Sequence, residues 1–488
     1  MLCFYAFNYL LVPVLIVSKM VGTPLKVLLK MIYRNVFNLN KTIGVISVRQ
    51  YANRNTLKLS ERGLYQDIFP AYSNQQIVDL LNAAPQTVYA GFDPTADSLH
   101  IGNLLVLISL IHWQKAGHNV IALIGEATAQ IGDPSGKSSE RQQLSGTFIA
   151  RNVESIRESI RQIFENHENL LWKDKRLPAV RFANNEDWYS RLNAVELVGQ
   201  VGRHFRMGTM LSRHSVKTRL ESEAGMSFTE FCYQIFQAYD WLHLLKKYNC
   251  RFQIGGNDQM GNIMSGQELI SRAEGVPVYG LTLPLVTNES GDKLGKSAGN
   301  AIWLRAGRTS PFEFYQFFVR TKDTEVEKLL KLYTFMSAVE ISSLMKTHQE
   351  EPGKRRAQKK LAQLVTLLVH GEAGLRSAED ITRALYNRDL VFLGQMTARD
   401  LSGVFDGSTS CELLLQPDMT TLQLAMGAGC FSTERDAVRI MTAGGFYINY
   451  QRVTNCDEIL RRDVHVLPNN VSVVRVGKKN HYIVRWLN

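Results

Sequence analysis

Apolar and polar positions between residues 87 and 124 are ordered in a way that predicts a strand, a helix and a second strand. Residues 87–92 are mostly apolar or β-branched and favour a strand. From residue 104 to residue 111 apolar side chains recur at helical spacing, with Ser98 as the expected N-cap and Gly117 as the expected stop. Residues 120–124 form a second apolar run. This order predicts a β-α-β unit of an open parallel sheet, in which ligands bind beyond the carboxyl ends of the strands.

The loop between the first strand and the helix carries groups suited to binding phosphate. His100, Gly102 and Asn103 stand at the predicted start of the helix, where free backbone N–H groups and the helix dipole attract anions. Gly102 lets a bulky group approach the backbone, and both Thr95 and His100 can hydrogen-bond a phosphate. Taken alone, this short motif equally fits an ordinary turn with a surface histidine.

A second glycine-containing loop carries two lysines and a serine. Lys293 and Lys296 are three residues apart and precede Ser297, so a loop of this kind can close over a polyphosphate, although by itself it is only a basic turn. The stretch from Gly132 to Ser138 looks at first like a P-loop. It has three residues between its glycines where the phosphate-cradling motif has four, so we exclude a P-loop.

The helical pattern of residues 228–240 carries polar groups on an otherwise apolar and aromatic helix. Tyr233, Gln237 and Asp240 share one face because they are spaced at i, i+4 and i+7. Burying a carboxylate and an amide is costly without polar partners, so these groups serve either a structural network or a bound substrate. Residues 251–263 follow as a predicted strand and a glycine-rich turn, whose paired glycines permit close approach of a nucleotide.

The rest of the chain predicts helices and a small terminal unit. Residues 150–225 have one apolar helical face and a basic stretch that contains Arg203, Arg206, Arg213, Lys217 and Arg219. Ser310-Pro311-Phe312-Glu313 has a cap, an initial proline and a third-position glutamate, so it predicts a helix start, and the helical pattern continues to about residue 402. Ser and Gly around 402–410 indicate a linker. Residues 419–488 then place Arg435 and Arg439 on one helix before a glycine turn.

Positive charge is concentrated at the front of the chain. The 488-residue sequence has a formal net charge of +11, but residues 1–60 contain eight Lys or Arg and no Asp or Glu, which leaves 48 basic against 45 acidic residues elsewhere. Because the chain after residue 60 carries almost no net charge, it must bind an anionic partner through local basic patches. The six cysteines are scattered and include no Cys-x-x-Cys pair, so neither a zinc site nor a disulfide framework is indicated.

The acid-free front of the chain fits a mitochondrial transit peptide. Residues 31–54 fit best, and Arg49-Gln50-Tyr51 resembles a processing site with cleavage after Tyr51. Residues 1–18 are almost wholly apolar, so a secretory signal or a membrane anchor is the alternative. That run is short for a membrane span, which needs about 20 residues, and we expect no stable membrane association. Met31 is an alternative start that would omit the run.

Two motifs together resemble the paired signatures of class I aminoacyl-tRNA synthetases. His100-Ile101-Gly102-Asn103 is similar to His-Ile-Gly-His, and Lys293-Leu294-Gly295-Lys296-Ser297 is similar to Lys-Met-Ser-Lys-Ser. Longer motifs extend the resemblance to the bacterial-type tyrosyl-tRNA synthetases, from about residue 60 to the end of the chain. Examples are Gly-Phe-Asp-Pro-Thr-Ala-Asp-Ser-Leu-His, Phe-Gln-Ala-Tyr-Asp and Gly-Gly-Asn-Asp-Gln. Asn103 departs from the second histidine of the family, but an amide still donates a hydrogen bond. Leu294-Gly295 departs from Met-Ser, but both lysines are kept.

The resemblance implies an α/β fold with a Rossmann-like parallel sheet, followed by an α-helical domain and a small α+β S4-like RNA-binding domain. The expected divisions are a mitochondrial targeting leader at 1–55, a catalytic domain at 56–290 with a helical insertion at about 150–225, a mobile loop and linker at 291–310, an anticodon-binding domain at 311–402, and the S4-like domain at 410–488. A small structural cap is the alternative for the last of these.

The resemblance also implies the site residues. Tyr89 and Asp240 would hold the phenolic hydroxyl of tyrosine, and the remaining tyrosine contacts would come from Asp133, Tyr233, Gln237 and Gln259. ATP would be held by Asp93, His100, Gly102, Asn103, Gly256, Asp258, Lys293, Lys296 and Ser297. Charge on the phosphates would be stabilised by Thr95, His100, Lys293 and Lys296, with Lys137 and Arg141 as further mobile cations. No protein nucleophile and no protein-bound metal are required.

The implied reaction is tyrosine–tRNA ligation in the mitochondrial matrix by a homodimer. Tyrosine would react with ATP, accompanied by Mg²⁺, to give tyrosyl-adenylate, and the tyrosyl group would then pass to tRNA(Tyr). Two alternatives remain at this point: an RNA-binding protein on a synthetase scaffold, such as an intron-splicing helper, and a tryptophan-specific relative. Tyrosine-dependent exchange between ATP and pyrophosphate separates the first from an enzyme, and Tyr89 with Asp240 argues against the second.

Overall fold

The computed structural model describes most of the chain after the leader. It covers residues 54–136, 144–174, 176–223, 225–286, 296–297, 300–387, 389–396, 409–477 and 480–487. The expected leader therefore lies almost wholly outside the described residues, and so does most of the expected 402–410 linker. The predicted cations Lys137, Arg141 and Lys293 also lie outside them.

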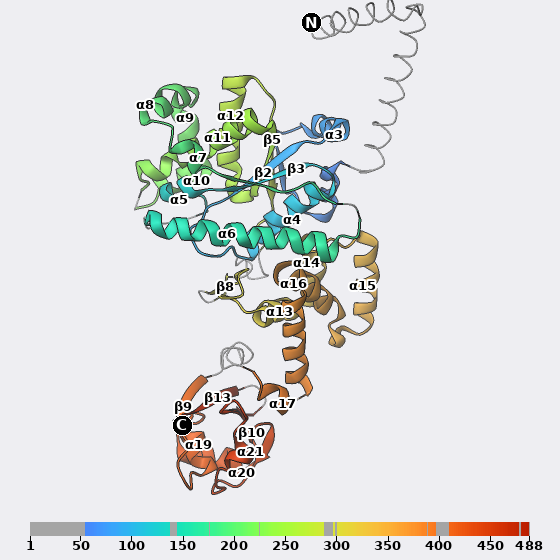
Figure 1. The fold of residues 1–488 in the computed structure, drawn as a ribbon, viewed down its shortest axis with the longest axis vertical. Coiled ribbons are helices and arrows are strands. Elements are labelled where there is room, and N and C mark those ends of the chain that lie inside the picture. The colour runs from blue at the N-terminus through green and yellow to red at the C-terminus, as the bar shows by residue number, and fades with distance from the viewer. Residues whose placement is uncertain are drawn as a thin grey trace, which may run out of the picture.

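A six-stranded sheet forms the core of the first half of the chain (Figure 1). Its order is β1 (Asp67–Phe69), β6 (Tyr279–Leu283), β5 (Cys250–Gly256), β2 (Thr87–Phe92), β3 (Asn119–Ile124) and β4 (Arg181–Asn184). Every neighbouring pair is parallel except β1 with β6. Because the chain passes from β2 to β3 on one side and later returns to β5 on the other, the direction of winding changes between β2 and β5. The carboxyl ends of these two strands are therefore the expected position of a ligand.

The predicted β-α-β unit is confirmed as β2, α4 (Ile101–Lys115) and β3. Ser98 is not the cap of the helix, so that prediction was wrong: its hydroxyl donates to Leu99 O and accepts from the backbone N of Arg305. The cap is His100, one residue before the helix. The helix ends just before the predicted stop, Gly117, whose φ of 81° is left-handed. Helix α4 is apolar around most of its surface because it is covered on several sides.

Three further helices belong to the sheet domain. Helix α3 (Asn74–Ala83) follows β1, and helices α5 (Glu126–Ile131) and α6 (Gly146–Asn166) follow β3. The predicted apolar face of α6 is buried, from Ile149 to Ile163. Strand β4 belongs to the sheet, so the range expected to form a helical insertion contains one strand of the core. Four short helices follow β4: α7 (Glu186–Tyr189), α8 (Ala194–Glu196), α9 (Met207–Leu211) and α10 (His214–Leu220). The chain then returns through α11 (Phe228–Tyr248) to β5 and α12 (Met260–Glu274).

The predicted helical region begins at Pro311, where Ser310 and Glu313 form the expected capping box. It contains α13 (Pro311–Val319), α14 (Asp323–Tyr333), α15 (Ala338–Glu350), α16 (Arg356–Asn387) and α17 (Leu390–Leu393). Helix α16 is interrupted at Gly371, whose φ of 67° no helix contains. This region packs beneath the sheet domain along α6 (Figure 1).

The C-terminal unit is a separate five-stranded α+β fold. Its sheet has the order β11 (Gln451–Val453), β10 (Phe446–Ile448), β12 (Val471–Val476), β13 (Asn480–Leu487) and β9 (Thr409–Leu414), and three helices accompany it: α19 (Thr421–Gly427), α20 (Glu434–Thr442) and α21 (Arg462–His465). The predicted order of basic helix, glycine turn and strand is confirmed. The unit joins the helical region through an apolar cluster that includes Phe312 and Leu467. No helix among the described residues combines the length and the apolar character that crossing a membrane requires.

Candidate active site

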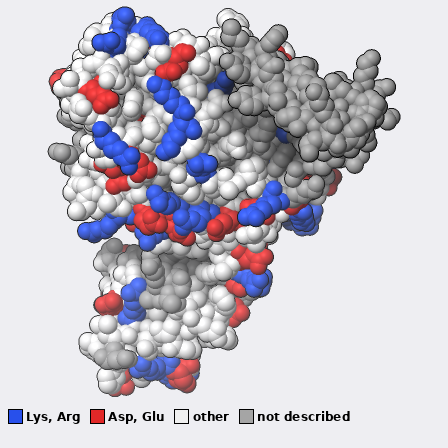
Figure 2. Space-filling view, turned by 45° about the horizontal axis from the view of Figure 1, so that its top comes forward, with Lys and Arg blue, Asp and Glu red and all other residues white. Residues whose placement is uncertain are grey.

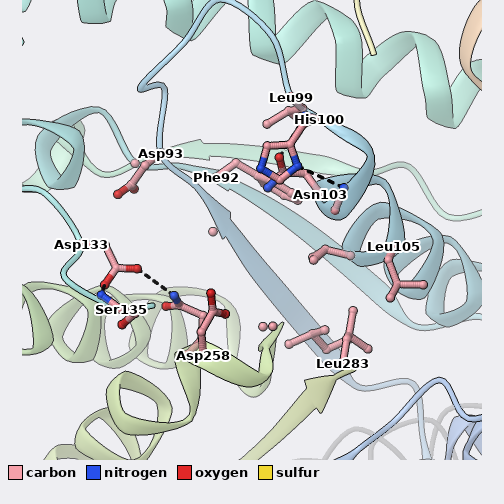
Figure 3. A pocket seen from close by; sticks show the side chains of 18 of the residues that line it. Phe92, Asp93, Leu99, His100, Asn103, Leu105, Asp133, Ser135, Asp258 and Leu283 are labelled. Carbon is pink, nitrogen blue, oxygen red and sulfur yellow. Dashed lines mark hydrogen bonds between the residues drawn. The ribbon is translucent and has the colours of Figure 1, made fainter. Parts of the chain in front are cut away.

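A cavity of about 480 Å³ opens where the switch point of the sheet predicts one (Figure 3). Its volume is typical of small-molecule sites, which range from about 300 to 1,000 Å³. Thirteen of the sequence-predicted site residues line it: Tyr89, Asp93, Thr95, His100, Gly102, Asn103, Asp133, Tyr233, Gln237, Asp240, Gly256, Asp258 and Gln259. They come from β2, α4, the loop after α5, α11 and the turn after β5, so the fold brings together segments about 170 residues apart.

One end of the cavity holds a buried carboxylate. Asp240 is 2% exposed, and its two oxygens accept hydrogen bonds from Trp188 Nε1 at 2.9 Å and Asn185 Nδ2 at 3.2 Å. Burial raises the pKa of Asp240 to about 7, against these hydrogen bonds, which lower it. The carboxyl group is therefore close to half ionised at neutral pH.

Tyr89 lies beside this carboxylate on β2. Its side chain is 1% exposed, and its hydroxyl has no hydrogen-bond partner among the described residues. Burial and the nearby charge of Asp240 raise the pKa of Tyr89 well above its usual value. A buried hydroxyl without a partner is costly, and it stands in the wall of a cavity. A polar group of a bound molecule would satisfy it.

The middle of the cavity contains two further acidic side chains that are fixed by the protein. The Asp93 carboxylate accepts from Tyr233 Oη and Thr128 Oγ1, each at 2.8 Å. The Asp133 carboxylate accepts from Gln259 Nε2 at 2.7 Å and from the backbone N of Ser135 at 2.9 Å. The hydrogen bonds form two sets, one around each carboxylate, and these two sets make up the polar floor of the cavity, which is suited to a cationic group.

The other end of the cavity is the N-terminus of α4. His100 Nδ1 accepts from the backbone N of Gly102 at 3.1 Å, and Asn103 Oδ1 accepts from the backbone N of His100 at 3.1 Å. The amide that departs from the family pattern thus completes a capping box. Because Nδ1 is an acceptor, the neutral imidazole carries its proton on Nε2 and can donate it. Figure 3 shows His100 and Asn103 on one side of the cavity and Asp133 and Asp258 on the other.

Of the second signature motif the structure describes Lys296 and Ser297, which precede a segment that lines the cavity. The backbone of β7 (Lys296–Ser297) pairs with β8 (Asn300–Ala301), and Ala301 lines the cavity. The following residues pair with the loop before α4: Ile101 N donates to Ile302 O at 3.0 Å, and Leu304 N donates to Leu99 O at 2.9 Å. Main-chain hydrogen bonds therefore join the first motif to the segment that follows the second, about 200 residues later in the sequence.

Comparison with known proteins decides the family. A family model described as tRNA synthetases class I (W and Y) matches residues 81–387. The chain is 56% identical over 445 residues to the mitochondrial tyrosine–tRNA ligase of Drosophila melanogaster, covering 90% of this chain and 96% of that protein. It is 46% identical to the mitochondrial tyrosine–tRNA ligase of Homo sapiens, covering 87% of this chain and 90% of that protein. The chain belongs to the class I tyrosyl-tRNA synthetase family.

Solved structures agree with this assignment. A C-terminally truncated mitochondrial tyrosyl-tRNA synthetase of Aspergillus nidulans has a TM-score of 0.61 and 34% identity, and the match covers 67% of this chain and 92% of that one. The corresponding truncated enzyme of Coccidioides posadasii has a TM-score of 0.61 and 31% identity, and the match covers 72% of this chain and 98% of that one. The predicted fold class and the predicted activity, tyrosine–tRNA ligation with ATP, tyrosine and tRNA as substrates, are confirmed.

Sequence reasoning missed several residues of the synthetase site. Asn185 and Trp188, which hold Asp240, follow β4 in a range expected to be helical. The rule that ligands gather at the carboxyl ends of parallel strands would have found them if β4 had been recognised. Trp303 and Tyr333 also line the cavity, and both come from beyond the predicted catalytic domain.

Two of the arginines in the predicted basic stretch have structural partners. Arg219 Nη2 lies 2.8 Å from Glu230 Oε2 with both side chains 2% exposed, and Arg213 Nη2 lies 2.7 Å from Glu268 Oε1. These two guanidinium groups are therefore committed to ion pairs inside the synthetase. Arg203 and Arg206 are the exposed arginines of the stretch.

Proposed function

We propose that the cavity carries out the first step of ligation, the attack of the tyrosine carboxylate on the α-phosphorus of ATP. The new bond joins a carboxylate oxygen to phosphorus, and the bond to the leaving pyrophosphate breaks. In the second step a hydroxyl of the terminal ribose of tRNA attacks the tyrosyl carbonyl, and AMP leaves. No protein group forms a covalent bond, so the cavity acts by positioning the reactants and by stabilising charge.

The observation that carries this proposal is that the buried carboxylate of Asp240 lies near the buried hydroxyl of Tyr89 in the wall of one cavity. The carboxylate is held by two donors, and the hydroxyl beside it has no partner among the described residues. The phenolic hydroxyl of tyrosine would donate to Asp240 and accept from Tyr89, which satisfies both. Phenylalanine would leave the Tyr89 hydroxyl without a partner and would offer Asp240 no donor, and the indole of tryptophan offers only a donor.

The neighbouring polar floor would hold the main-chain end of tyrosine. Asp133, Tyr233 and Gln237 would contact its ammonium group, because a carboxylate and two neutral polar groups line the same part of the cavity. Gln259, hydrogen-bonded to Asp133, would lie beside the carboxylate of tyrosine. Tyrosine bound in this way would direct its nucleophilic carboxylate towards the N-terminus of α4.

ATP would occupy the end that begins with His100. The Nε2–H of His100 and the hydroxyl of Thr95 would donate to phosphate oxygens, and Gly102 and Asn103 would present donors at the N-terminus of α4. Asp258 and Gly256 would meet the ribose, and Asp93 would support this region by holding Tyr233. Lys293, Lys296 and Ser297 would approach the phosphates from the second motif, because the backbone of Lys296 pairs with Ala301, which lines the cavity.

Mg²⁺ would enter with ATP rather than occupy a site built by the protein. No group of three or more His, Cys, Asp and Glu side chains is placed to hold a metal ion within the described part of the chain. We expect the phosphates and water to supply most ligands of the ion, which would neutralise phosphate charge.

Substitution of Asp240 tests the assignment of the tyrosine pocket. Asp240→Ala should sharply lower tyrosine-dependent exchange of pyrophosphate into ATP, because the phenolic hydroxyl of tyrosine would lose its acceptor and Asn185 and Trp188 would lose theirs. Asp187→Ala is the matched control, since that carboxylate lies on α7 and does not line the cavity. Unchanged exchange in the Asp240 variant would contradict the assignment.

The second half of the chain would bind tRNA. Figure 2 shows acidic and basic side chains interspersed over one face, so no single basic field covers it and local groups must contact the phosphates. Arg435 on α20 is exposed, and the Arg475 guanidinium lies 4.0 Å from the centre of the Tyr447 ring. We assign residues 311–402 to anticodon binding and residues 410–488 to an S4-like RNA-binding domain.

The enzyme would act as a homodimer in the mitochondrial matrix. Large apolar side chains are exposed from the segment after β4 to the first residue of α11, including Val195, Met207 and Phe228, which is 80% exposed. An apolar surface of this kind is typical of a contact between proteins. The acid-free leader and the mitochondrial names of the relatives support import into the matrix.

A further inference from the structure

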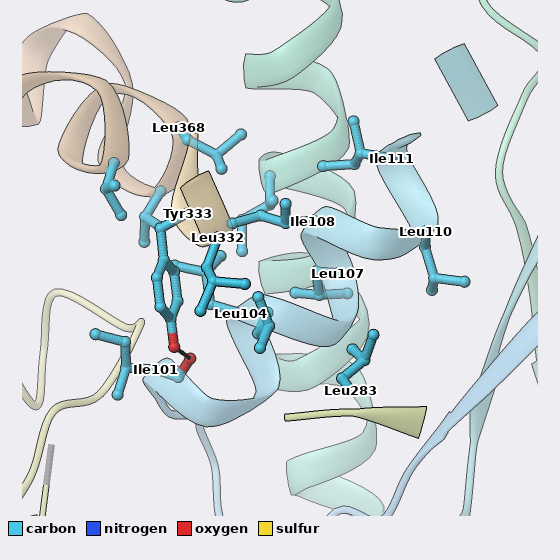
Figure 4. Packing of buried hydrophobic residues seen from close by; sticks show 14 of the residues in the cluster. Ile101, Leu104, Leu107, Ile108, Leu110, Ile111, Leu283, Leu332, Tyr333 and Leu368 are labelled. Atoms are coloured by element: carbon cyan, nitrogen blue, oxygen red, sulfur yellow. Dashed lines mark hydrogen bonds between the residues drawn. The ribbon is translucent and has the colours of Figure 1, made fainter. Parts of the chain in front are cut away.

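Tyr333 reaches from the helical region into the catalytic cavity. It is the last residue of α14, it is 1% exposed, and it lines the cavity. Its hydroxyl donates to the backbone oxygen of Ile101 at 3.3 Å, a contact that Figure 4 shows with the tyrosine ring lying among buried apolar side chains. The Tyr333 hydroxyl therefore contacts the backbone of the first residue of α4.

The backbone at Ile101 forms part of the proposed nucleotide end. It follows the capping residue His100, and its N–H already donates to Ile302 O on the segment that follows the second motif. Tyr333 contacts the carbonyl of the same residue. The N–H of Ile101 is thus bound by the segment after the second motif, and its carbonyl oxygen is bound by Tyr333. Two segments therefore hold the first turn of α4 at a single residue.

Arg62 fixes the end of α14 on which Tyr333 stands. Its guanidinium donates to Lys331 O at 3.0 Å, to Thr334 O at 2.7 Å and to Met336 O. The last carbonyls of a helix lack partners within the helix, and a cation at that end also complements the helix dipole. Arg62 lies in the 3-10 helix Thr56–Arg62, near the start of the described chain. One side chain from the front of the protein therefore caps a helix of the helical region.

We propose that Arg62 and Tyr333 are positioning residues for tyrosine activation. Arg62 holds the end of α14, and Tyr333, held there, sets the position of the first turn of α4 relative to the phosphates of ATP. This inference rests on the proposed function, because it takes that turn as the nucleotide end. Its consequence is that the helical region contributes to a step that does not involve tRNA.

Tyr333→Phe is the test, because it removes the hydroxyl and keeps the ring in the core. In pyrophosphate exchange with the full chain we expect the KM for ATP to rise about two- to ten-fold, the range for loss of one hydrogen bond to a neutral group. The KM for tyrosine should change less than about two-fold. Tyr65→Phe is the matched control: its hydroxyl accepts from Trp113 Nε1, at the far end of the same helix α4. That variant should leave both KM values unchanged.

A purely structural role for Tyr333 would not separate the two substrates. Equal changes in both KM values, or a lowered thermal midpoint with unchanged KM for ATP, would overturn the inference. The wild-type protein separates this failure from a failure of the proposed function, because absence of tyrosine-dependent exchange in the wild type would contradict the function itself.

Arg62→Met tests the remaining link, since it keeps the apolar stem and removes the three donors. The variant should raise the KM for ATP in the same direction as Tyr333→Phe. Combined with Tyr333→Phe, it should add little, because both changes act on one path. Fully additive effects, or an unchanged KM for ATP in Arg62→Met, would remove Arg62 from the proposal. Arg161→Met, an exposed arginine on α6, is its control.

Discussion

The carboxyl group of Asp240 would make binding in the proposed tyrosine pocket depend on pH. Its pKa is raised to about 7 by burial, so the group is ionised above pH 7 and protonated below it. Only the ionised form offers both oxygens as acceptors while Asn185 and Trp188 donate to it. We therefore expect tyrosine to bind about ten-fold more weakly at pH 6 than at pH 8, since about one tenth of the group remains ionised one pH unit below its pKa.

Calorimetric titration with tyrosine between pH 6 and pH 8 measures this effect. Asp240→Asn is the control, because the amide does not titrate: it should bind more weakly at every pH, with a flat profile. The same slope in wild type and variant would assign the pH dependence to another group.

Single residues also show where sequence reasoning reached its limit. The spacing of Tyr233, Gln237 and Asp240 predicted that they share a face, and all three line the cavity. Spacing says nothing about partners that come from elsewhere in the chain, so the donors Asn185 and Trp188 stayed unrecognised. Whether each lining residue contacts tyrosine or ATP stays a prediction.

At the scale of elements, hydrophobic periodicity and capping residues predict the helices whose position local sequence determines. The long apolar pattern of α6 and the capping box of α13 were recognised correctly. Strand β4 was missed because it has four residues, of which only Ala183 is buried. The prediction of Ser98 as the cap of α4 is wrong because the Ser98 hydroxyl accepts from the backbone N of Arg305. Local sequence pattern cannot anticipate this contact with a residue about 200 positions later.

A buried ion pair fixes the start of α11. Glu230 stands one turn into this helix, and its carboxylate meets Arg219 of α10 with both side chains 2% exposed. Glu230→Gln should lower the free energy of unfolding by about 3–5 kcal/mol, because it leaves a buried guanidinium without its counter-charge. Denaturant unfolding measures the change.

The exposed pair in the same segment provides the comparison. Lys217 and Glu221 lie 3.9 Å apart with both side chains 67% exposed, so Glu221→Gln should change stability very little. A stability loss of similar size in both variants would show that the burial of the Arg219–Glu230 pair is not what makes it important.

At the scale of the whole molecule, the segment between β4 and α11 predicts self-association. Phe228→Asp places a charge where an 80% exposed aromatic ring stands, and it should convert a dimer to a monomer, because a charge in an apolar interface is costly. Light scattering coupled to gel filtration measures the mass. Phe148→Asp, at an exposed aromatic residue of α6, should leave the dimer intact. A dimeric Phe228 variant would place the interface elsewhere.

Because Tyr333 of the helical region contacts Ile101 and lines the cavity, the cavity is completed late in the synthesis of the chain. The residues proposed to hold tyrosine all precede residue 260, but Leu283, Ala301, Trp303 and Tyr333 also line the cavity. A nascent chain that ends before residue 300 therefore lacks three of these lining residues. We expect tyrosine activation only after the helical region up to α14 has been synthesised.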